Sequence, residues 1–265
     1  MTEYGNVIFI TIAYSRVHRN DEEKYCFLKS AKSDNFQKLS LKNTSALTKQ
    51  LISIKKMAKV QYMPPLKEKH RCSWVNKDPI YIQYHDTEWG VPIYDERLLF
   101  EFLNLEGMQA GLSWLTILKR RDNYRNCFDH FDADLISKYD EAKVNLLLSN
   151  PGIIRNKLKV RAIISNAKAF LEVKKEWGDF SKYLWHFVGG SPLQNHWESF
   201  KQLPTTTPIS DAMSKDLKKR GFKFIGSTIC YAFMQAVGMV NDHTMDCYRY
   251  SQKLATKEHI NKILK

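Results

Sequence analysis

The sequence lacks a hydrophobic run long enough to cross a membrane. A transmembrane helix needs about 20 consecutive apolar residues, and the longest apolar stretch, Val7–Tyr14, is much shorter. No Lys or Arg precedes that stretch, whereas a secretory signal peptide begins with positive charge. We therefore expect a protein that neither spans a membrane nor carries an export signal.

The sequence also lacks the even set of cysteines that a disulfide framework uses. Its five cysteines are spread over 265 residues, at Cys26, Cys72, Cys127, Cys230 and Cys247. An odd number in a long chain without an export signal favours free or metal-bound thiols in a reducing compartment. We expect a monomer in the cytoplasm.

Acidic residues are relatively scarce, since 41 Lys and Arg stand against 28 Asp and Glu, and the formal net charge is +13. This balance favours solubility or, more specifically, a polyanionic partner such as nucleic acid. The excess is uneven: residues 1–70 carry 13 basic and 6 acidic side chains, and residues 71–265 carry 28 and 22. The main body is only mildly basic, so charge alone leaves both readings open.

The chain shows no alternation of strand and helix patterns and no repeat of fixed period. Apolar residues instead recur at helical spacing, and turns punctuate them. Helices are predicted over residues 97–107, 114–128, 135–139, 141–149, 157–177, 180–188, 210–220 and 227–237. Predicted N-caps are Asp95, Ser113, Asp132 or Asp134, Asp140, and Ser210 or Asp211, and Gly107 is predicted to end the first helix. The fold class is therefore all-α.

Residues 1–66 differ from the rest. They are mostly polar with little periodicity, and the pair Pro64-Pro65 breaks any helix that reaches it. We expect residues 1–66 to be an N-terminal extension, disordered in part or foreign to the native domain. Residues 67–250 would form the domain, and residues 251–265 a basic C-terminal tail.

Two Cys/His pairs have spacings typical of metal ligands. Twelve residues separate Cys72 from His85, and three separate His243 from Cys247, which puts the second pair on one face of a helical turn. Two thiolates and two imidazoles suit a closed, structural Zn²⁺ site. A shared ion would join the first and last segments of the domain. The alternative is two unrelated pairs.

Aromatic residues crowd the stretch from 71 to 114, and the carboxylate of Glu106 follows an apolar helical run beside them. The aromatic residues are Trp74, Tyr81, Tyr84, Trp89 and Trp114. Such rings often form an ordinary core, but a buried carboxylate is costly unless it meets a partner. An acid beside stacked rings suits a flat cation. The pattern predicts an aromatic pocket; the alternative is that Glu106 ends a helix and faces solvent.

A third motif, KKRGFKFIGST at 218–228, combines a basic helix, a glycine-bearing turn and a second helix. Backbone N–H groups at the start of the second helix, with Lys223 beside them, suit a phosphate. Turns of this kind are also common between helices that bind nothing. Asn150–Ile154 is a weaker candidate for the same role.

Together these segments resemble the 3-methyladenine DNA glycosylase I family, a branch of the helix–hairpin–helix glycosylases. The resemblance runs from about Arg71 to Cys247 and leaves out residues 1–66. The segments that carry it are RCSWVNKDPIYIQYHDTEWGVP, LEGMQAGLSWLTILKRRDNYRNCF, NPGIIRNKLKVRAII and TPISDAMSKDLKKRGFKFIGSTICYAFMQAVGMVNDH.

The resemblance implies a helix–hairpin–helix domain and a role for each candidate residue. One structural Zn²⁺ would be bound by Cys72, His85, His243 and Cys247. The damaged base would be hydrogen-bonded by Glu106, the catalytic residue, and by Tyr84. Its faces would pack on Trp74 and Trp114, and Tyr81 would line the pocket. The hairpin that grips double-stranded DNA would include Gly221, Lys223 and Gly226.

The implied reaction is hydrolysis of the N-glycosidic bond of 3-methyladenine after the nucleotide is flipped from the duplex. Leu112 or Gln109 would fill the vacated space in the base stack. N3-methylation makes the base cationic and a good leaving group, so the enzyme need not protonate it. Glu106 and Asp242 are candidates to position the attacking water.

Two departures from the wider superfamily predict a hydrolase without lyase activity. Asn241 stands where other members place a catalytic Asp, and Thr228 stands where lyase members place a Lys. A Schiff base requires that amine. The rival functions are a non-catalytic, zinc-stabilised DNA- or nucleotide-binding module and a glycosylase of the same fold for another alkylated base.

Overall fold

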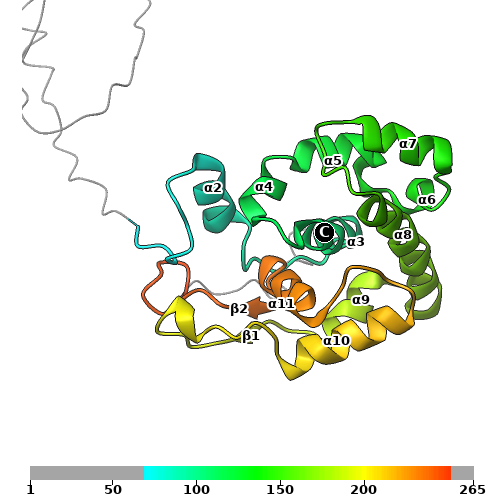
Figure 1. Cartoon of the computed structure of the whole chain (residues 1–265). Helices are drawn as coiled ribbons and strands as arrows, with labels where there is room; N and C mark the ends of the chain where they lie inside the picture. The colour runs from blue at the N-terminus through cyan, green and yellow to red at the C-terminus, as the bar shows by residue number, and fades with distance from the viewer. Residues whose placement is uncertain (1–68, 252–265) are drawn as a thin grey trace, which may run out of the picture. The chain divides into compact units, whose positions relative to one another are not determined.

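The computed structural model describes residues 69–251, which are mainly helical, as the periodicity predicted (Figure 1). The predicted extension at 1–66 lies outside the described residues, as does most of the predicted tail. The α-helices are α2 (Pro79–Thr87), α3 (Glu96–Gln109), α4 (Trp114–Leu118), α5 (Arg121–Cys127), α6 (Ala133–Ile136), α7 (Glu141–Ser149), α8 (Lys157–Trp177), α9 (Phe180–Trp185), α10 (Pro208–Lys219) and α11 (Ser227–Ala236). Within residues 69–251, no helix combines the length and apolar character of a membrane span.

Short 3₁₀ turns and one small sheet complete the described part of the chain. The turns are η1 (Asp129–Phe131), η2 (His186–Val188) and η3 (Phe200–Gln202). The strands β1 (Leu193–Gln194) and β2 (Val240–Asn241) pair in parallel. The sequence did not predict them, because two-residue strands carry no detectable alternation. They tie the segment after η2 to the segment after α11.

Side-chain caps fix where the helices begin, because they satisfy backbone N–H groups that the first turn leaves free. Four predicted caps are confirmed, namely Asp95 for α3, Ser113 for α4, Asp132 for α6 and Asp140 for α7. The predicted cap of α10 at Ser210 or Asp211 is wrong. Thr207 caps that helix, and Pro208 opens its first turn, where its missing N–H costs nothing.

Helix α2 was not predicted, and the bounds of several predicted helices differ from the structure. The helix predicted over 114–128 is divided into α4 and α5 at Lys119 and Arg120. Gly107 does not end α3, which continues to Gln109. A Cβ on Gly107 would lie only 3.1 Å from the carbonyl oxygen of Phe224. The glycine therefore allows the 221–226 hairpin to approach α3 closely.

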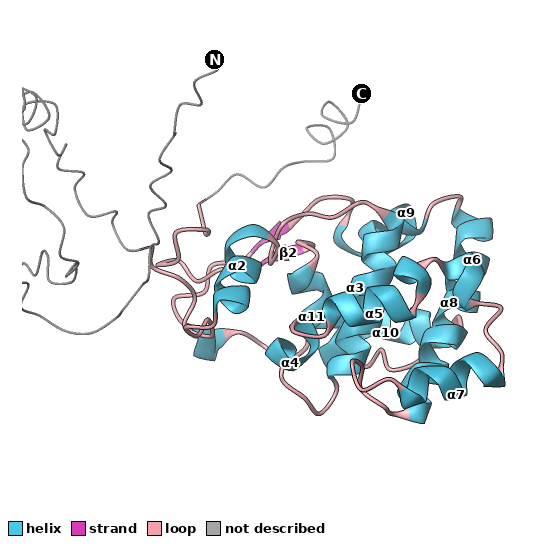
Figure 2. Cartoon of the chain, turned by 90° about the horizontal axis from the view of Figure 1, so that it is seen from above, coloured by secondary structure: helices cyan, strands magenta, loops and turns pink. Residues whose placement is uncertain are grey.

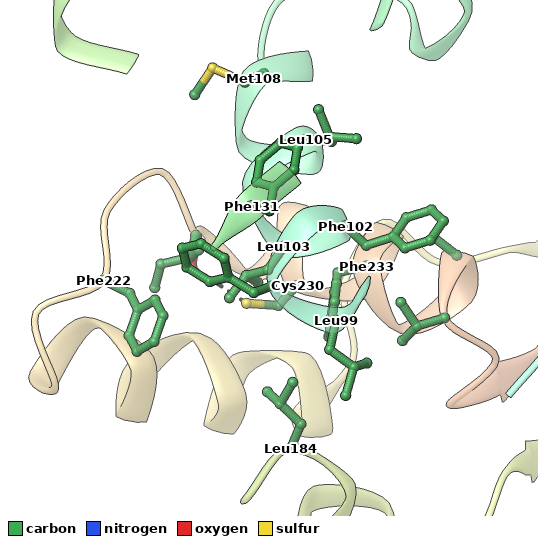
Figure 3. Close-up of a cluster of buried hydrophobic side chains, with 14 of the residues drawn as sticks. Leu99, Phe102, Leu103, Leu105, Met108, Phe131, Leu184, Phe222, Cys230 and Phe233 are labelled. Atoms are coloured by element: carbon green, nitrogen blue, oxygen red, sulfur yellow. Dashed lines mark hydrogen bonds between the residues drawn. The ribbon is translucent and has the colours of Figure 1, made fainter. Parts of the chain in front are cut away.

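Helix α3 is the centre of the domain, with α4, α8, α9 and α11 around it (Figures 1 and 2). Its residues from Leu99 to Met108 are all buried, so the helix has no solvent face over this length. Its apolar side chains meet residues from four other segments (Figure 3). These are Phe131 of η1, Leu184 of α9, Phe222 of the hairpin, and Cys230 and Phe233 of α11.

Three polar residues of α3 are buried in this core and need partners. Glu101 accepts hydrogen bonds from the guanidinium groups of Arg121 and Arg125. Asn104 donates to the Phe100 carbonyl at 2.8 Å and accepts from Asn166 at 2.9 Å. Glu106 differs from both, because its Oε2 atom is buried without a hydrogen-bond partner.

The end of α11 fastens the aromatic segment after α2 to the core. The N–H of Gly90 donates to the Gln235 carbonyl at 3.0 Å, and the N–H of Ile93 donates to the Val237 carbonyl at 3.1 Å. At Gly238 the backbone has φ +69°, and an added Cβ would lie 2.4 Å from the backbone nitrogen of Pro92. Only glycine fits this close approach.

We expect Gly238→Ala to lower the free energy of unfolding by about 2–4 kcal/mol, because it combines backbone strain with overlap. Gly178→Ala is the matched control: Gly178 has φ +74° with nothing within 4 Å of an added Cβ. That change should cost about 1 kcal/mol. Urea unfolding of the two variants measures the difference. Equal losses would contradict the close approach at Gly238.

Candidate functional site

A cavity of about 200 Å³ lies beside the buried face of Glu106. Its walls come from the segment that leads into α2, from α2 itself, and from α3, α4, η3 and α11. The lining residues are Trp74, Tyr81, Tyr84, Trp89, Glu106, Gln109, Trp114, Phe200, Ala232 and Gln235. The structure thus brings all five predicted aromatic residues and the predicted carboxylate to one cavity.

The rings of this cavity are set at steep angles to one another. Trp74 lies 5.0 Å from Tyr81 at an interplanar angle of 59°, and 5.0 Å from Trp89 at 71°. Tyr84 lies 5.5 Å from Trp114 at 49°. None of these pairs is a parallel stack, so the rings form walls around a space. Such walls can offer their electron-rich faces to a flat, electron-poor ligand.

Glu106 is 3% exposed, and burial raises the pKa of its carboxyl group to about 8. The carboxyl is therefore largely protonated near neutral pH while the cavity holds no cation. A positive charge entering the cavity would favour the carboxylate. The alternative of Glu106 at a solvent-facing helix end is excluded.

Two further polar atoms of the cavity walls are buried without partners, the indole nitrogens of Trp74 and Trp114. A buried polar group left unpaired costs about 1–3 kcal/mol. Together with Glu106, these atoms offer two N–H donors and one carboxyl oxygen. A polar, planar ligand that donates a hydrogen bond to Glu106 would satisfy its carboxyl oxygen.

The tyrosines of the cavity stay protonated. Burial, followed by the nearby Glu106, raises the pKa of Tyr84 well above its ordinary value. The same two causes raise the pKa of Tyr81. Both phenols therefore remain available as hydrogen-bond donors. Tyr84 is almost fully buried, whereas Tyr81 is partly exposed at the edge.

Asp242, a candidate to position the attacking water, instead accepts hydrogen bonds from surrounding side chains. It is 1% exposed, and its two oxygens accept four hydrogen bonds of 2.6–2.8 Å. The donors are Asn195, Trp197, Tyr231 and Gln235. Asp242 therefore ties the segment 195–197 to α11 and orients the Gln235 amide. It has no free oxygen for a water molecule.

Cys72, His85, His243 and Cys247 form one buried cluster whose ligand atoms all lie within 4.8 Å of one another. The Cys72 and Cys247 sulfurs are each 3.5 Å from Nδ1 of His243, and the Cys247 sulfur is 3.4 Å from Nε2 of His85. Tetrahedral Zn²⁺ with ordinary Zn–S and Zn–N bonds would separate sulfur and nitrogen by about 3.5 Å. The cluster has the donor set and size for such an ion, and the reading of two unrelated pairs is wrong.

Outer hydrogen bonds orient these ligands, as is usual around a metal. Nδ1 of His85 lies 2.9 Å from an Asp86 oxygen, and Nε2 of His243 lies 3.2 Å from the Trp89 carbonyl oxygen. Hydrogen bonding with Cys72 lowers the pKa of Cys247, and the same contact raises the pKa of Cys72.

The predicted DNA-contacting residues lie on the surface. Leu112 is 39% exposed in the turn after α3. Lys223 is exposed in the hairpin whose ends are Gly221 and Gly226. In the weaker candidate at Asn150–Ile154, two N–H groups are already committed, since Gly152 donates to the Asn150 side chain and Ile154 donates to the Tyr124 hydroxyl.

Three residues of the cavity were missed by the sequence reasoning. Ala232 and Gln235 lie on α11, and Phe200 lies on η3, far along the chain from Trp74. Ala232 and Gln235 are three residues apart, and this spacing could have placed both on one face of the helix predicted over 227–237. Phe200 gave no signal, because a turn of tertiary origin brings it to the cavity.

A larger hollow, of about 1000 Å³, lies along α8 away from this cavity. Three of its four cations are paired with carboxylates: Lys174 with Glu96 at 2.7 Å, Lys175 with Glu172 at 2.6 Å and Arg220 with Glu176 at 2.6 Å. The fourth, Lys168, is exposed to solvent. The smaller aromatic cavity is therefore the candidate site.

The chain is similar to known proteins of one kind, both by a family model and by individual sequences. The family model for methyladenine glycosylase matches residues 74–250. The chain is 51% identical over 180 residues to DNA-3-methyladenine glycosylase 1 of Escherichia coli strain K12, covering 68% of this chain and 96% of that protein. It is 49% identical over 177 residues to DNA-3-methyladenine glycosylase of Haemophilus influenzae, covering 67% and 96%.

Solved structures agree with these relatives. A crystal structure of 3-methyladenine DNA glycosylase I superposes with a TM-score of 0.67 at 55% identity, covering 68% of this chain and 98% of that one. The Staphylococcus aureus enzyme, solved to explain 3-methyladenine recognition, superposes with a TM-score of 0.67 at 37% identity, covering 68% and 96%.

The raised pKa of Glu106 predicts how stability depends on pH. The folded protein holds the Glu106 proton more tightly than the unfolded chain does. The stability that this proton contributes is therefore fully present below pH 4.5 and is lost as the pH rises through about 8. Relative to Glu106→Gln, the wild type should lose up to about 1.4 kcal/mol of unfolding free energy per pH unit in this window.

Denaturant unfolding at a series of pH values measures this loss. Glu172→Gln is the control, because Glu172 lies on the surface of α8 and pairs with Lys175 there. That variant should keep the pH dependence of the wild type. Identical pH profiles for the wild type and Glu106→Gln would contradict the buried carboxyl.

Proposed function

The chain belongs to the methyladenine glycosylase family and is a DNA glycosylase, and we propose from this premise that it excises 3-methyladenine from alkylated double-stranded DNA. It does so by flipping the damaged nucleotide into the aromatic cavity and hydrolysing the N-glycosidic bond. The observation that carries the proposal is the partnerless Oε2 of Glu106 inside a cavity of aromatic rings.

Selection of the substrate rests on charge. N3-methylation gives adenine in DNA a positive charge that ordinary adenine lacks, and indole faces attract such a ring. As the cation enters, Glu106 releases its proton to solvent water, and the carboxylate accepts hydrogen bonds from the base. A neutral base would leave the acid without this partner, at a cost of about 1–3 kcal/mol. Tyr84 donates to the bound base, Trp74 and Trp114 cover its faces, and Tyr81 lines the edge.

Little acid catalysis is required, because the cationic base is already a good leaving group. The protein must hold the flipped nucleotide and supply water to the sugar carbon. Asp242 is fully engaged with four donors. We therefore assign the orientation of water to Glu106, the carboxylate among the cavity-lining residues.

The reaction stops at hydrolysis. A lyase step needs an amine that attacks the sugar, and the residues that line the cavity include no lysine. Thr228 stands where lyases place that amine. Asn241 is buried, and its amide donates to Gln194 at 2.8 Å, so it has a structural task.

DNA is held at two surface loops. Leu112 enters the gap that the flipped nucleotide leaves, with Gln109 as the neighbouring alternative. The hairpin with Gly221, Lys223 and Gly226 binds the phosphate backbone through its N–H groups and the lysine ammonium. The enzyme acts as a monomer in the cytoplasm, a reducing compartment that suits the four cysteines of the described residues, which form no disulfide.

A single structural Zn²⁺ is bound by Cys72, His85, His243 and Cys247. The four donors are those that zinc prefers in closed sites, and the sulfur–nitrogen distances fit the ion. With no open position, the ion would supply structure and no chemistry at the base. It would fix Trp74, Tyr84 and Trp89, which adjoin its ligands or hydrogen-bond them.

The central test is release of 3-methyladenine from methylated duplex DNA. The wild type should release it, and Glu106→Gln should do so about ten- to a hundredfold more slowly, through loss of a charge-assisted hydrogen bond. Glu172→Gln should match the wild type. Borohydride should trap no covalent adduct. Absence of release by a folded wild type would favour a non-catalytic DNA-binding module, and release of other bases only would reassign the substrate.

Metal analysis tests the cluster. The purified protein should contain one zinc per chain, and Cys247→Ser should lose it and melt at least about 5 °C lower. Cys127→Ser is the matched control, because that thiol is partly buried outside the cluster and contacts Asn150. A stable wild type free of zinc would refute the site.

A further inference from the structure

Lys159 is a buried lysine and the third residue of α8. Its residue is only 6% exposed, and burial lowers the pKa of its ammonium group. A buried lysine is costly unless its charge meets strong acceptors. Its Nζ donates to the Met108 carbonyl at 2.8 Å and to the Ala110 carbonyl at 2.6 Å. Both carbonyls lie at the C-terminal end of α3.

These contacts fix the turn that leads from Glu106 to Trp114. The last carbonyls of a helix have no partner within it, and a cation there is favoured by the helix dipole. The turn is closed by the Leu112 N–H, which donates to the Gln109 carbonyl at 2.6 Å. It is otherwise open to its surroundings, since Gly111 has φ +77° with nothing within 4 Å of an added Cβ, and Leu112 is exposed. Lys159 therefore supplies a rigid anchor beside the turn proposed to fill the base stack.

Asn166 holds the second DNA-contacting loop from the same helix. Its Oδ1 accepts from the Lys223 N–H at 2.7 Å, and its Nδ2 donates to the Lys223 carbonyl at 3.2 Å and to Asn104 of α3 at 2.9 Å. The neighbouring Ser165 donates to the Gly221 carbonyl at 3.1 Å. The hairpin backbone is thus fixed at two points to α8.

Lys159 and Asn166 are seven residues apart, which places them on one face of α8 and about 10 Å apart along its axis. One face of a single rigid helix therefore holds both loops. Neither side chain lines the aromatic cavity. Their contacts act on the backbone of the loops that would meet DNA.

We propose that Lys159 and Asn166 are positioning residues, which set the distance between the base-displacing turn 109–112 and the hairpin 221–226 on duplex DNA. This inference rests on the proposed function. The hairpin fixes the backbone of the damaged strand, and the turn must then meet the base stack at a set distance from it. An error of about 1 Å in such a placement can cost about a hundredfold in rate.

The test compares Lys159→Met and Asn166→Leu with the wild type. Both changes preserve size and remove the polar contacts. Lys168→Met is the control, because Lys168 is an exposed lysine on the same helix. Three quantities are measured: 3-methyladenine release from methylated duplex, release from methylated single strands, and binding of free 3-methyladenine to the protein.

We expect Lys159→Met and Asn166→Leu to slow release from the duplex by about tenfold or more. Release from single strands should fall less, because no base stack must be opened. Binding of free 3-methyladenine should stay within about twofold of the wild type, since the cavity is intact.

A fluorescence measurement reports on the base stack directly. In duplexes with 2-aminopurine opposite an abasic-site analogue, binding of the wild type should raise the 2-aminopurine fluorescence more than binding of either variant does.

Two results would overturn the inference. One is an unchanged ratio of duplex to single-strand release. The other is an equal loss of duplex release and free-base binding, which would mean that the two residues support the fold in general. Failure of the wild type to release 3-methyladenine is a separate result, and it would refute the proposed function instead.

Discussion

The burial of one carboxyl group without a hydrogen-bond partner is the constraint on which the site depends. Glu106 lies on a helix that is enclosed on all sides, and the other buried polar residues of that helix are paired. An unpaired acid in such a place costs stability. The rings around it do not satisfy it, since the Trp74 and Trp114 nitrogens are unpaired as well. In the function that we propose, the cavity therefore discriminates by charge, because a cation would relieve a cost that a neutral ring leaves in place.

The Cys/His cluster and the aromatic cavity are built from neighbouring residues of the same segments. Cys72 stands two residues before Trp74, and His85 directly follows Tyr84. His243 reaches the same wall from the far end of the domain, through its hydrogen bond with the Trp89 carbonyl. Closing the cluster therefore draws three cavity rings together. Trp74 and Trp89 lie outside the helices, and a bound ion would give them the rigidity that Tyr84 already has within α2.

Helices α3 and α8 have separate roles in placing the parts of the site. Helix α3 carries Glu106 and leads into the turn before Trp114, while α8 holds that turn and the hairpin by buried side chains. Asp242 does the corresponding work at the other wall, where it joins α11 to the segment before η3. In each case a buried polar residue with several partners fixes a segment that lies between helices. This is how an all-helical framework can place loops accurately.

Local chemistry made much of this protein readable from its sequence. Caps such as Asp95 and Asp140 satisfy N–H groups a few residues away, and the amphipathic pattern of 157–177 predicted α8 to the residue. The ligand spacings and the acid beside an apolar run indicated the cluster and the cavity with alternatives open, and the family resemblance favoured both. Other features depend on contacts between distant segments. The continuation of α3 past Gly107 depends on the hairpin, and Phe200 reaches the cavity only through the fold.

The pairing of buried polar groups was likewise decided by the tertiary structure. The sequence showed Asp242 and Glu106 as two equivalent carboxylates. Asp242 proved to have four donors around it, whereas Glu106 has an oxygen with none. A residue's type fixes what hydrogen bonds it can make, but its partners are brought by segments far away in the chain. For that reason the sequence determined the helices and the candidate chemistry, and only the packing decided which acid was free to act.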